Sequence, residues 1–219
     1  MKRLFGIFFC IISLLFSAQA KEPVREFVRD SLHAYRKQLT HRENHRLISE
    51  YKIQSLIALS YYPDLDGVDI HFKKKNLKTT MAAVPRWDFI FKSKENRSYR
   101  IFVNTTVKKG KGVLPDQVPL NAQIGLIGHE LGHVVDFESK TGAGILLTGV
   151  AYLLPPFRKK LERKVDEITV ARGLGHQLKD FSDFVLNESD ASEKYKKYKQ
   201  RYYYKPVQLT RVMSGYSFY

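Results

Sequence analysis

The pentapeptide His129-Glu130-Leu131-Gly132-His133 lies inside an apolar stretch near the middle of this chain of 219 residues. Histidines four residues apart project from the same face of an α-helix, so both imidazoles can bind one metal ion. Glu130 is the neighbour of His129 and points beside such an ion, where a carboxylate acts as a base on metal-activated water. The spacing therefore predicts a helix that carries two metal ligands and one catalytic carboxylate.

The residues around the pentapeptide have the period of an amphipathic helix. Apolar side chains recur every three or four residues, at Ile124, Ile127, Leu131, Val134 and Val135. Asn121 is a candidate N-cap for this helix. Gly125, Gly128 and Gly132 also share one side, and each costs a helix about 1 kcal/mol relative to alanine. Three of them predict that another segment packs very close to that side. The alternative is a core helix with two incidental histidines.

A catalytic zinc ion takes three protein ligands and keeps a fourth position for water. Glu162 and Asp166 lie one turn apart in a second helix-like segment, which follows Pro155 and Pro156. Glu162 is the candidate third ligand. Asp166 can accept a hydrogen bond from the non-ligating N–H of a zinc-bound histidine, for which His129 is the first candidate. The alternative is a solvated, charged helix face.

HExxH followed at short range by ExxxD resembles the gluzincin metallopeptidases, and among them the compact M48-like and minigluzincin forms. The resemblance covers residues 128–175 and leaves the rest of the chain unmatched. M48-like sequences usually have alanine before the aspartate of the second motif, whereas Val165 stands there in this chain. This difference concerns the placement within the group more than the chemistry of the motif.

Carried over position by position, the resemblance implies that His129, His133 and Glu162 bind one Zn²⁺ ion. It makes Glu130 the general base and Asp166 the partner that orients a histidine. The implied function is that of a zinc metalloendopeptidase, which hydrolyses a protein or peptide substrate through zinc-activated water. Two alternatives stay open: a catalytically silent zincin-fold binding or scaffold protein of the cell envelope, and a zinc hydrolase of non-peptide amides.

Peptide hydrolysis also needs a donor that stabilises the oxyanion of the transition state. His176, just past the second helix, and Tyr152, before it, are candidates by residue type. Both are chosen for their chemistry, because the sequence alone places neither side chain near the metal.

Three other patterns are weaker metal candidates. Asp136 follows His133 by three residues, where a metzincin would have glycine. Residues 41–45 also place two histidines four apart, but in a polar segment, which favours a solvated helix face. Residues 64–69 resemble a calcium loop, yet the glycine comes too early and no closing glutamate follows, so we expect a turn.

The first 20 residues have the three parts of a secretory signal peptide: a basic start, the apolar stretch Leu4–Phe16 and a small-residue cleavage site ending at Ala20. The alternative is an uncleaved anchor. Cys10 is the only cysteine and lies inside this leader, so the mature protein would contain no thiol. We therefore expect an exported protein of the periplasm or the extracellular space, without disulfides.

The chain is strongly basic, with 37 Lys and Arg against 22 Asp and Glu and a net charge of +15. The densest basic runs are residues 73–75, 108–111, 158–164 and 194–201. Behind a signal peptide, peripheral contact with an anionic membrane surface or an acidic protein fits better than nucleic acid, which we do not expect as a partner. A basic surface without a specific partner is equally compatible.

After the leader, residues 21–219 are expected to form a single zincin-like metallopeptidase domain. The expected fold class is α+β, with a small, mostly antiparallel sheet, the HExxH helix and C-terminal helices. The elements expected before that helix are a helix over 22–51 and strands over 55–61, 67–72, 79–84, 89–92 and 99–105.

Three of these segments carry a functional expectation. The resemblance implies that strand 99–105 forms the rim of the cleft and pairs with extended substrate, although a plain structural strand is equally compatible. The uncharged segment 142–154 is too short to cross a bilayer. It is compatible with a buried connector, a cleft wall or a membrane-interface segment, and we favour the buried connector over the interface. The C-terminal part, a helix over 191–204 and a tail without periodicity, or the helix over 22–51, is a candidate plug over the cleft.

Overall fold

The computed structural model describes residues 21–28, 32, 45–106 and 112–219. The expected leader lies outside these residues, and so does half of the expected helix over 22–51. Within the described part of that range, residues 21–28 contain no helix, and residues 45–51 contain strand β1 (His45–Arg46) and the 3-10 helix η3 (Ser49–Tyr51). The expected helix is therefore wrong for those two stretches.

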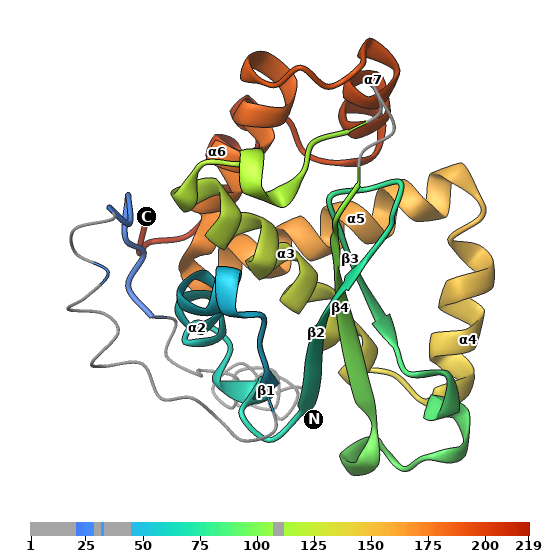
Figure 1. The fold of residues 1–219 in the computed structure, drawn as a ribbon. Coiled ribbons are helices and arrows are strands. Elements are labelled where there is room, and N and C mark those ends of the chain that lie inside the picture. Colours follow the sequence, from blue (N-terminus) through green and yellow to red (C-terminus); the bar gives the residue numbers. More distant parts are fainter. Residues whose placement is uncertain (1–20, 29–31, 33–44, 107–111) are drawn as a thin grey trace, which may run out of the picture.

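The fold is α+β, as expected, and helices surround one four-stranded sheet (Figure 1). The other strands are β2 (Asp69–Lys75), β3 (Met81–Pro85) and β4 (Ser98–Asn104), in the order β1-β2-β4-β3. Pairs β1–β2 and β2–β4 are parallel, and only β3–β4 is antiparallel. The expectation of a mostly antiparallel sheet is therefore wrong. Alternation along a strand reports which face is buried, not which neighbour the strand pairs with.

Three of the five expected strands are confirmed to within a few residues, as β2, β3 and β4. The segment 55–61 instead belongs to helix α2 (Lys52–Leu59), and 89–92 overlaps the 3-10 helix η5 (Trp87–Phe91). Residues 55–59 are all buried, so no alternation distinguishes a buried helix from a buried strand there.

Strand β4, the expected rim of the cleft, lies between β2 and β3. Both of its edges are paired, so it has no free edge for a substrate. That expectation is wrong, and β3 is the edge strand instead. The β3–β4 pairing extends beyond β3 through Asn104 N–H, which donates to Thr80 O (3.1 Å), and Arg86 N–H, which donates to Ser98 O (2.9 Å).

Helix α3 (Leu120–Glu138) carries the HExxH pentapeptide and lies in the middle of the fold (Figure 1). The helices that follow are α4 (Gly142–Ala151), α5 (Pro155–Thr169), α6 (Gly175–Asp183), α7 (Glu193–Tyr202) and α8 (Pro206–Met213). Helix α3 packs against α2, α5, α6 and strand β3. Pro119, not Asn121, is its N-cap; Asn121 is buried and accepts a hydrogen bond from Phe27 N–H.

The close packing predicted from the glycines of α3 is confirmed. A side chain added at Gly125 would overlap the backbone carbonyl of Gln177 in α6. At Gly128 a Cβ would lie 2.7 Å from Leu174 Cδ1, and at Gly132 it would lie 3.0 Å from Val165 Cγ1. The glycines therefore let α5 and α6 approach the metal-binding helix closely.

Gly125→Ala is expected to destabilise the protein by more than about 3 kcal/mol, the upper end of ordinary overpacking, because the obstacle is backbone. Gly149→Ala is the matched control, since Gly149 lies in α4 with open space around it. Alanine there should stabilise the fold by up to about 1 kcal/mol. Urea unfolding of both variants checks this; equal midpoints would contradict the packing of α3 on α6.

Two expectations for the second half of the chain are wrong. The segment 142–154 is not a buried connector: it forms α4 and a turn, and only Ile145 and Thr148 are buried. The tail is not irregular, because α8 packs Leu209 and Met213 against other helices. The helix expected over 191–204 is confirmed as α7. Among the described residues, no helix combines the length and apolarity that crossing a membrane requires.

Candidate metal centre

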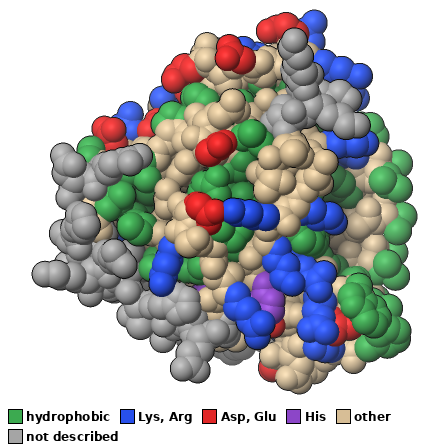
Figure 2. Space-filling view, viewed as in Figure 1, with side chains coloured by type: hydrophobic (Ala, Val, Ile, Leu, Met, Phe, Trp, Pro, Cys, Tyr) green, Lys and Arg blue, Asp and Glu red, His purple; other side chains and the backbone are tan. Residues whose placement is uncertain are grey.

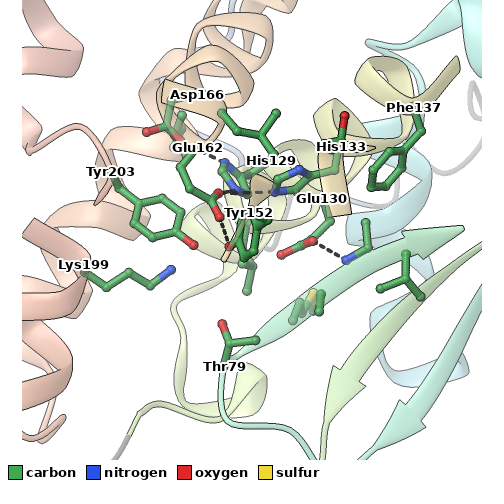
Figure 3. Close-up of a pocket in the computed structure, with 18 of the residues that line it drawn as sticks. Thr79, His129, Glu130, His133, Phe137, Tyr152, Glu162, Asp166, Lys199 and Tyr203 are labelled. Carbon is green, nitrogen blue, oxygen red and sulfur yellow. Dashed lines mark hydrogen bonds and ion pairs between the residues drawn. The ribbon is translucent and has the colours of Figure 1, made fainter. Parts of the chain in front are cut away.

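Helices α3 and α5 bring all five residues of the two motifs together (Figure 3). His129, Glu130 and His133 come from α3, and Glu162 and Asp166 come from α5. Glu162 Oε2 lies 3.3 Å from Nε2 of His129 and 3.3 Å from Nε2 of His133. One ligand atom from each of these three residues lies within 4.8 Å of the other two. The group is therefore close enough to bind one metal ion.

One oxygen of the Glu162 carboxylate accepts a hydrogen bond and the other does not. Its Oε1 accepts a hydrogen bond from the Tyr152 hydroxyl. Its Oε2 is buried and has no hydrogen bond within the part of the chain that the structure describes. A buried carboxylate oxygen without a partner is costly, and a divalent cation between Oε2 and the two imidazoles would remove that cost. The residues present therefore fit a metal ion.

Asp166 orients His129, as the sequence predicts. His129 Nδ1 lies 2.9 Å from Asp166 Oδ1, and Asp166 Oδ2 accepts the backbone N–H of Tyr204 (3.0 Å). Because Nδ1–H donates to the carboxylate, Nε2 is the ring nitrogen that faces Glu162 and is left to bind a metal ion. The second carboxylate therefore fixes both the tautomer and the ring orientation of His129.

The site stabilises positive charge despite its burial. Burial lowers the pKa of His129, but the hydrogen bond with Asp166 and the nearby carboxylate of Glu162 more than offset it and raise the pKa to about 10. Burial raises the pKa of Glu162, but contacts with the two histidines hold it well below its usual range. Both shifts show that a cation at this position is electrostatically favoured.

Glu130 lies beside the two histidines and is held by the edge strand. Its Oε2 accepts the backbone N–H of Ala83 in β3 at 2.6 Å (Figure 3). The N–H of Ala83 points away from β4, because the β3 residues at even positions face that neighbour. The carboxylate is buried and lines the same cavity as the three candidate ligands. This is the position that a base beside the metal requires.

A cavity of about 590 Å³ contains the metal centre. It lies between β3, α3, α4, α5 and α7, and most of its lining is apolar. Its volume lies in the range typical of ligand-binding cavities in proteins.

Helix α7 contributes residues that sequence reasoning missed. The Lys199 side chain lines the cavity, and its ammonium lies 3.9 Å from the centre of the Tyr203 ring (Figure 3). Within the described residues, the ammonium of Lys199 makes no hydrogen bond or ion pair. Burial lowers the pKa of Lys199, but Tyr195, Glu162 and other groups of the cavity more than offset it, so the pKa is raised. Tyr195, Lys199 and Tyr203 are four residues apart and therefore share one helix face. The sequence around them does not indicate which other element this face packs against.

The two candidate oxyanion donors have different outcomes. Tyr152 lines the cavity, but its hydroxyl donates to Glu162. His176 does not come to the site: its ring packs against Tyr219, with the ring centres 5.3 Å apart, and it does not line the cavity. The chain turns at Gly173, where φ is 94°, so His176 leaves the axis of α5 and belongs to α6. The expectation for His176 is therefore wrong.

The weaker metal candidates take no part in this centre. Asp136 is buried and pairs with Lys140 and Lys164 (2.7 Å for Lys164). His45 is buried in β1, with Nε2 3.0 Å from Leu65 O, so the expected solvated helix face is wrong there; residues 41–44 lie outside the described part. In residues 64–69 the turn expected there is formed by residues 66–68, between the 3-10 helix η4 (Pro63–Leu65) and the first residue of β2.

The expectation that a terminal segment covers the cleft can be compared with the structure in full only for the C-terminal part. Part of the cavity wall is formed by Tyr198, Lys199, Tyr203 and Tyr204. These residues do not fill the cavity, which keeps a volume of about 590 Å³. Half of the expected N-terminal helix, residues 29–31 and 33–44, lies outside the described residues. The C-terminal segment is therefore a component of the site and not merely a cover.

Comparisons of the chain with protein-family models, with curated proteins and with solved structures found no match. The resemblance of residues 128–175 to gluzincins is thus a resemblance of two short motifs. The function of the protein has to be inferred from the residues of the centre itself.

Proposed function

We propose that this protein is a zinc-dependent metallopeptidase with a zincin-like fold, in which His129, His133 and Glu162 hold the ion. The convergence of three ligand atoms from two helices carries the proposal. Tetrahedral zinc with bonds of about 2.0–2.1 Å separates its ligand atoms by about 3.3–3.4 Å. Glu162 Oε2 lies 3.3 Å from both imidazole nitrogens. Two of the three distances between candidate ligand atoms therefore match zinc, and the third, between the two histidines, is at most 4.8 Å.

Zinc, when bound, supplies a Lewis acid that activates water and polarises the scissile carbonyl group. Glu130 accepts the proton of the attacking water and passes it to the leaving amine. The N–H of Ala83 holds the Glu130 carboxylate beside the histidines, and Asp166 holds the ring of His129. These contacts position the base and the ligands before the substrate arrives.

A peptide substrate is favoured by strand β3, which borders the cavity with its free edge. Residues 81–85 all line the cavity. The N–H of Ala83 is taken by Glu130 and Pro85 has no N–H, so an extended peptide would pair with the remaining outward backbone groups of this edge and lie across the candidate metal centre. A compact non-peptide amide would leave most of this edge unused.

The proposal is tested by metal analysis combined with mass-spectrometric profiling of peptide cleavage. We expect one zinc per chain, cleavage of internal peptide bonds, loss of cleavage on chelation and recovery on addition of zinc. A protein that holds zinc but cleaves no peptide in a diverse library would instead be a binding or scaffold protein.

Lys199 is proposed as the positive charge that faces the oxyanion. Lys199→Met should lower kcat by about 10²–10³-fold, because a preorganised donor at a developing charge is worth that much. Zinc content should not change, since Lys199 ligates nothing. Lys197→Met is the matched control on the exposed side of α7. Steady-state kinetics with one peptide measure both; an unchanged kcat for Lys199→Met would contradict this role.

A further inference from the structure

Most of the large apolar side chains that are exposed in the described part of the chain lie on one surface. Ten such side chains are exposed, and eight belong to η5 and to the stretch from α4 through the turn before α5. These eight, called the apolar face below, are Trp87, Ile90, Phe91, Leu146, Leu147, Val150, Leu153 and Leu154. Trp87 is 72% exposed, Phe91 80% and Leu153 73%. Exposure of this extent, concentrated on one surface, is typical of an interaction site.

The two segments of the apolar face are neighbours in space. Helix α4 packs against η5, and a Cβ on Gly142 would lie 3.4 Å from Ile90 Cα. Residues 142–154 include no charged side chain. In Figure 2 apolar side chains gather along the edge of the molecule where α4 lies in Figure 1. The eight side chains therefore form one surface.

Basic residues flank the apolar face at both ends. Beside η5 are Arg86, Lys92 and Lys94, and after Leu154 come Arg158, Lys159 and Lys160. The acidic residues near η5 are Asp88 and Glu95, and Asp88 is paired with Arg86 (3.3 Å) and Lys92 (3.2 Å). The cations are therefore in excess around the uncharged centre.

We propose that the apolar face docks on a bilayer surface that contains anionic lipid. An apolar helix face flanked by lysines suits the boundary between acyl chains and anionic headgroups. The exposed tryptophan fits the same boundary, because its ring is amphipathic. Helix α4 has ten residues and lies in the interface without crossing it.

Docking would bring the cavity to the membrane. Leu146, Val150 and Leu153 are exposed and also line the cavity, so they form its rim. This step rests on the proposed function: for a peptidase docked in this way, the substrates are polypeptide segments at the membrane surface. The docking itself needs neither zinc nor turnover.

Trp87 is the only tryptophan of the chain, so its fluorescence reports directly on the apolar face. We expect a blue shift with vesicles of phosphatidylcholine and phosphatidylglycerol, and quenching when the acyl chains carry bromine. Vesicles of phosphatidylcholine alone should bind more weakly. Co-sedimentation of the full chain with the same vesicles measures the partition coefficient. Because this readout is independent of cleavage, its failure would leave the proposed function untouched.

Two sets of variants separate the apolar and the charged contributions. Leu147→Ser with Leu153→Ser should lower the partition coefficient by about 10-fold or more per leucine. Lys159→Gln with Lys160→Gln should lower it by about 5-fold per lysine. Val207→Ser, an exposed apolar residue in α8, and Lys197→Gln are the matched controls and should bind as wild type.

Three outcomes would overturn the proposal. One is the same Trp87 emission with and without vesicles and no co-sedimentation. A second is binding that depends on the lysines but not on the leucines, which indicates adsorption of a charged surface. The third is a dimer in sedimentation velocity that the leucine variants dissociate, without vesicle binding, which identifies the face as an interface between copies.

Discussion

Glu130→Gln is expected to abolish peptide hydrolysis, with a loss in kcat of at least about 10²–10⁴-fold, while fold and zinc content stay unchanged. General base catalysis by a positioned side chain is worth that much, and glutamine cannot take a proton from water. The fold should tolerate the change because the contact that Glu130 makes in the structure uses it as an acceptor. The amide oxygen of glutamine can still accept the N–H of Ala83, at the position where Glu130 Oε2 lies 2.6 Å from it.

The measurement compares kcat and bound zinc for Glu130→Gln and for Glu138→Gln. Glu138 lies at the end of the same helix and accepts a hydrogen bond from the Tyr99 hydroxyl, outside the cavity. The control should keep both activity and zinc. Wild-type turnover by Glu130→Gln would contradict the mechanism. Loss of zinc together with turnover would instead make Glu130 a structural part of the centre.

The candidate metal centre was predictable because its information is local. Two histidines four residues apart share a helix face in any fold, and Glu162 and Asp166 are one turn apart for the same reason. That the two helices meet was suggested by the glycines of α3, because such residues are expensive in a helix unless another element needs the space. Gly132 contacts Val165, which lies between the two carboxylates of α5.

The parts that were missed depend on contacts far apart in the sequence. Whether β4 is central or at the edge depends on the path of the chain between strands, which the alternation of residues 99–105 does not record. The same holds for Lys199, whose helix reaches the cavity from almost 70 residues after Glu130. Segment 142–154 was misjudged for a different reason: an apolar stretch is expected to be buried, whereas most of this one is exposed on the apolar face.

The Glu162 carboxylate is the group on which the metal centre depends most. Glu162→Gln removes the only anionic ligand, so zinc affinity should fall by more than about 100-fold, beyond the range of changes in the residues that orient ligands. Asp166→Asn should cost about 10–100-fold, because the ligand stays and only its orientation and basicity suffer. The order of the two losses is therefore predicted as well as their size.

Competition with a chromophoric chelator measures zinc affinity for both variants and for Glu167→Gln, the matched control. Glu167 is exposed, accepts the Tyr204 hydroxyl (2.7 Å) and lies on the other side of Asp166 from the ligand carboxylate along α5. The fold of Glu162→Gln should persist, since its amide can donate to an imidazole nitrogen, and urea unfolding checks this. Wild-type zinc affinity in Glu162→Gln would show that Glu162 is not the third ligand. Because Glu162 is the only candidate ligand that α5 supplies beside the two histidines, the proposed peptidase mechanism would then fail with it.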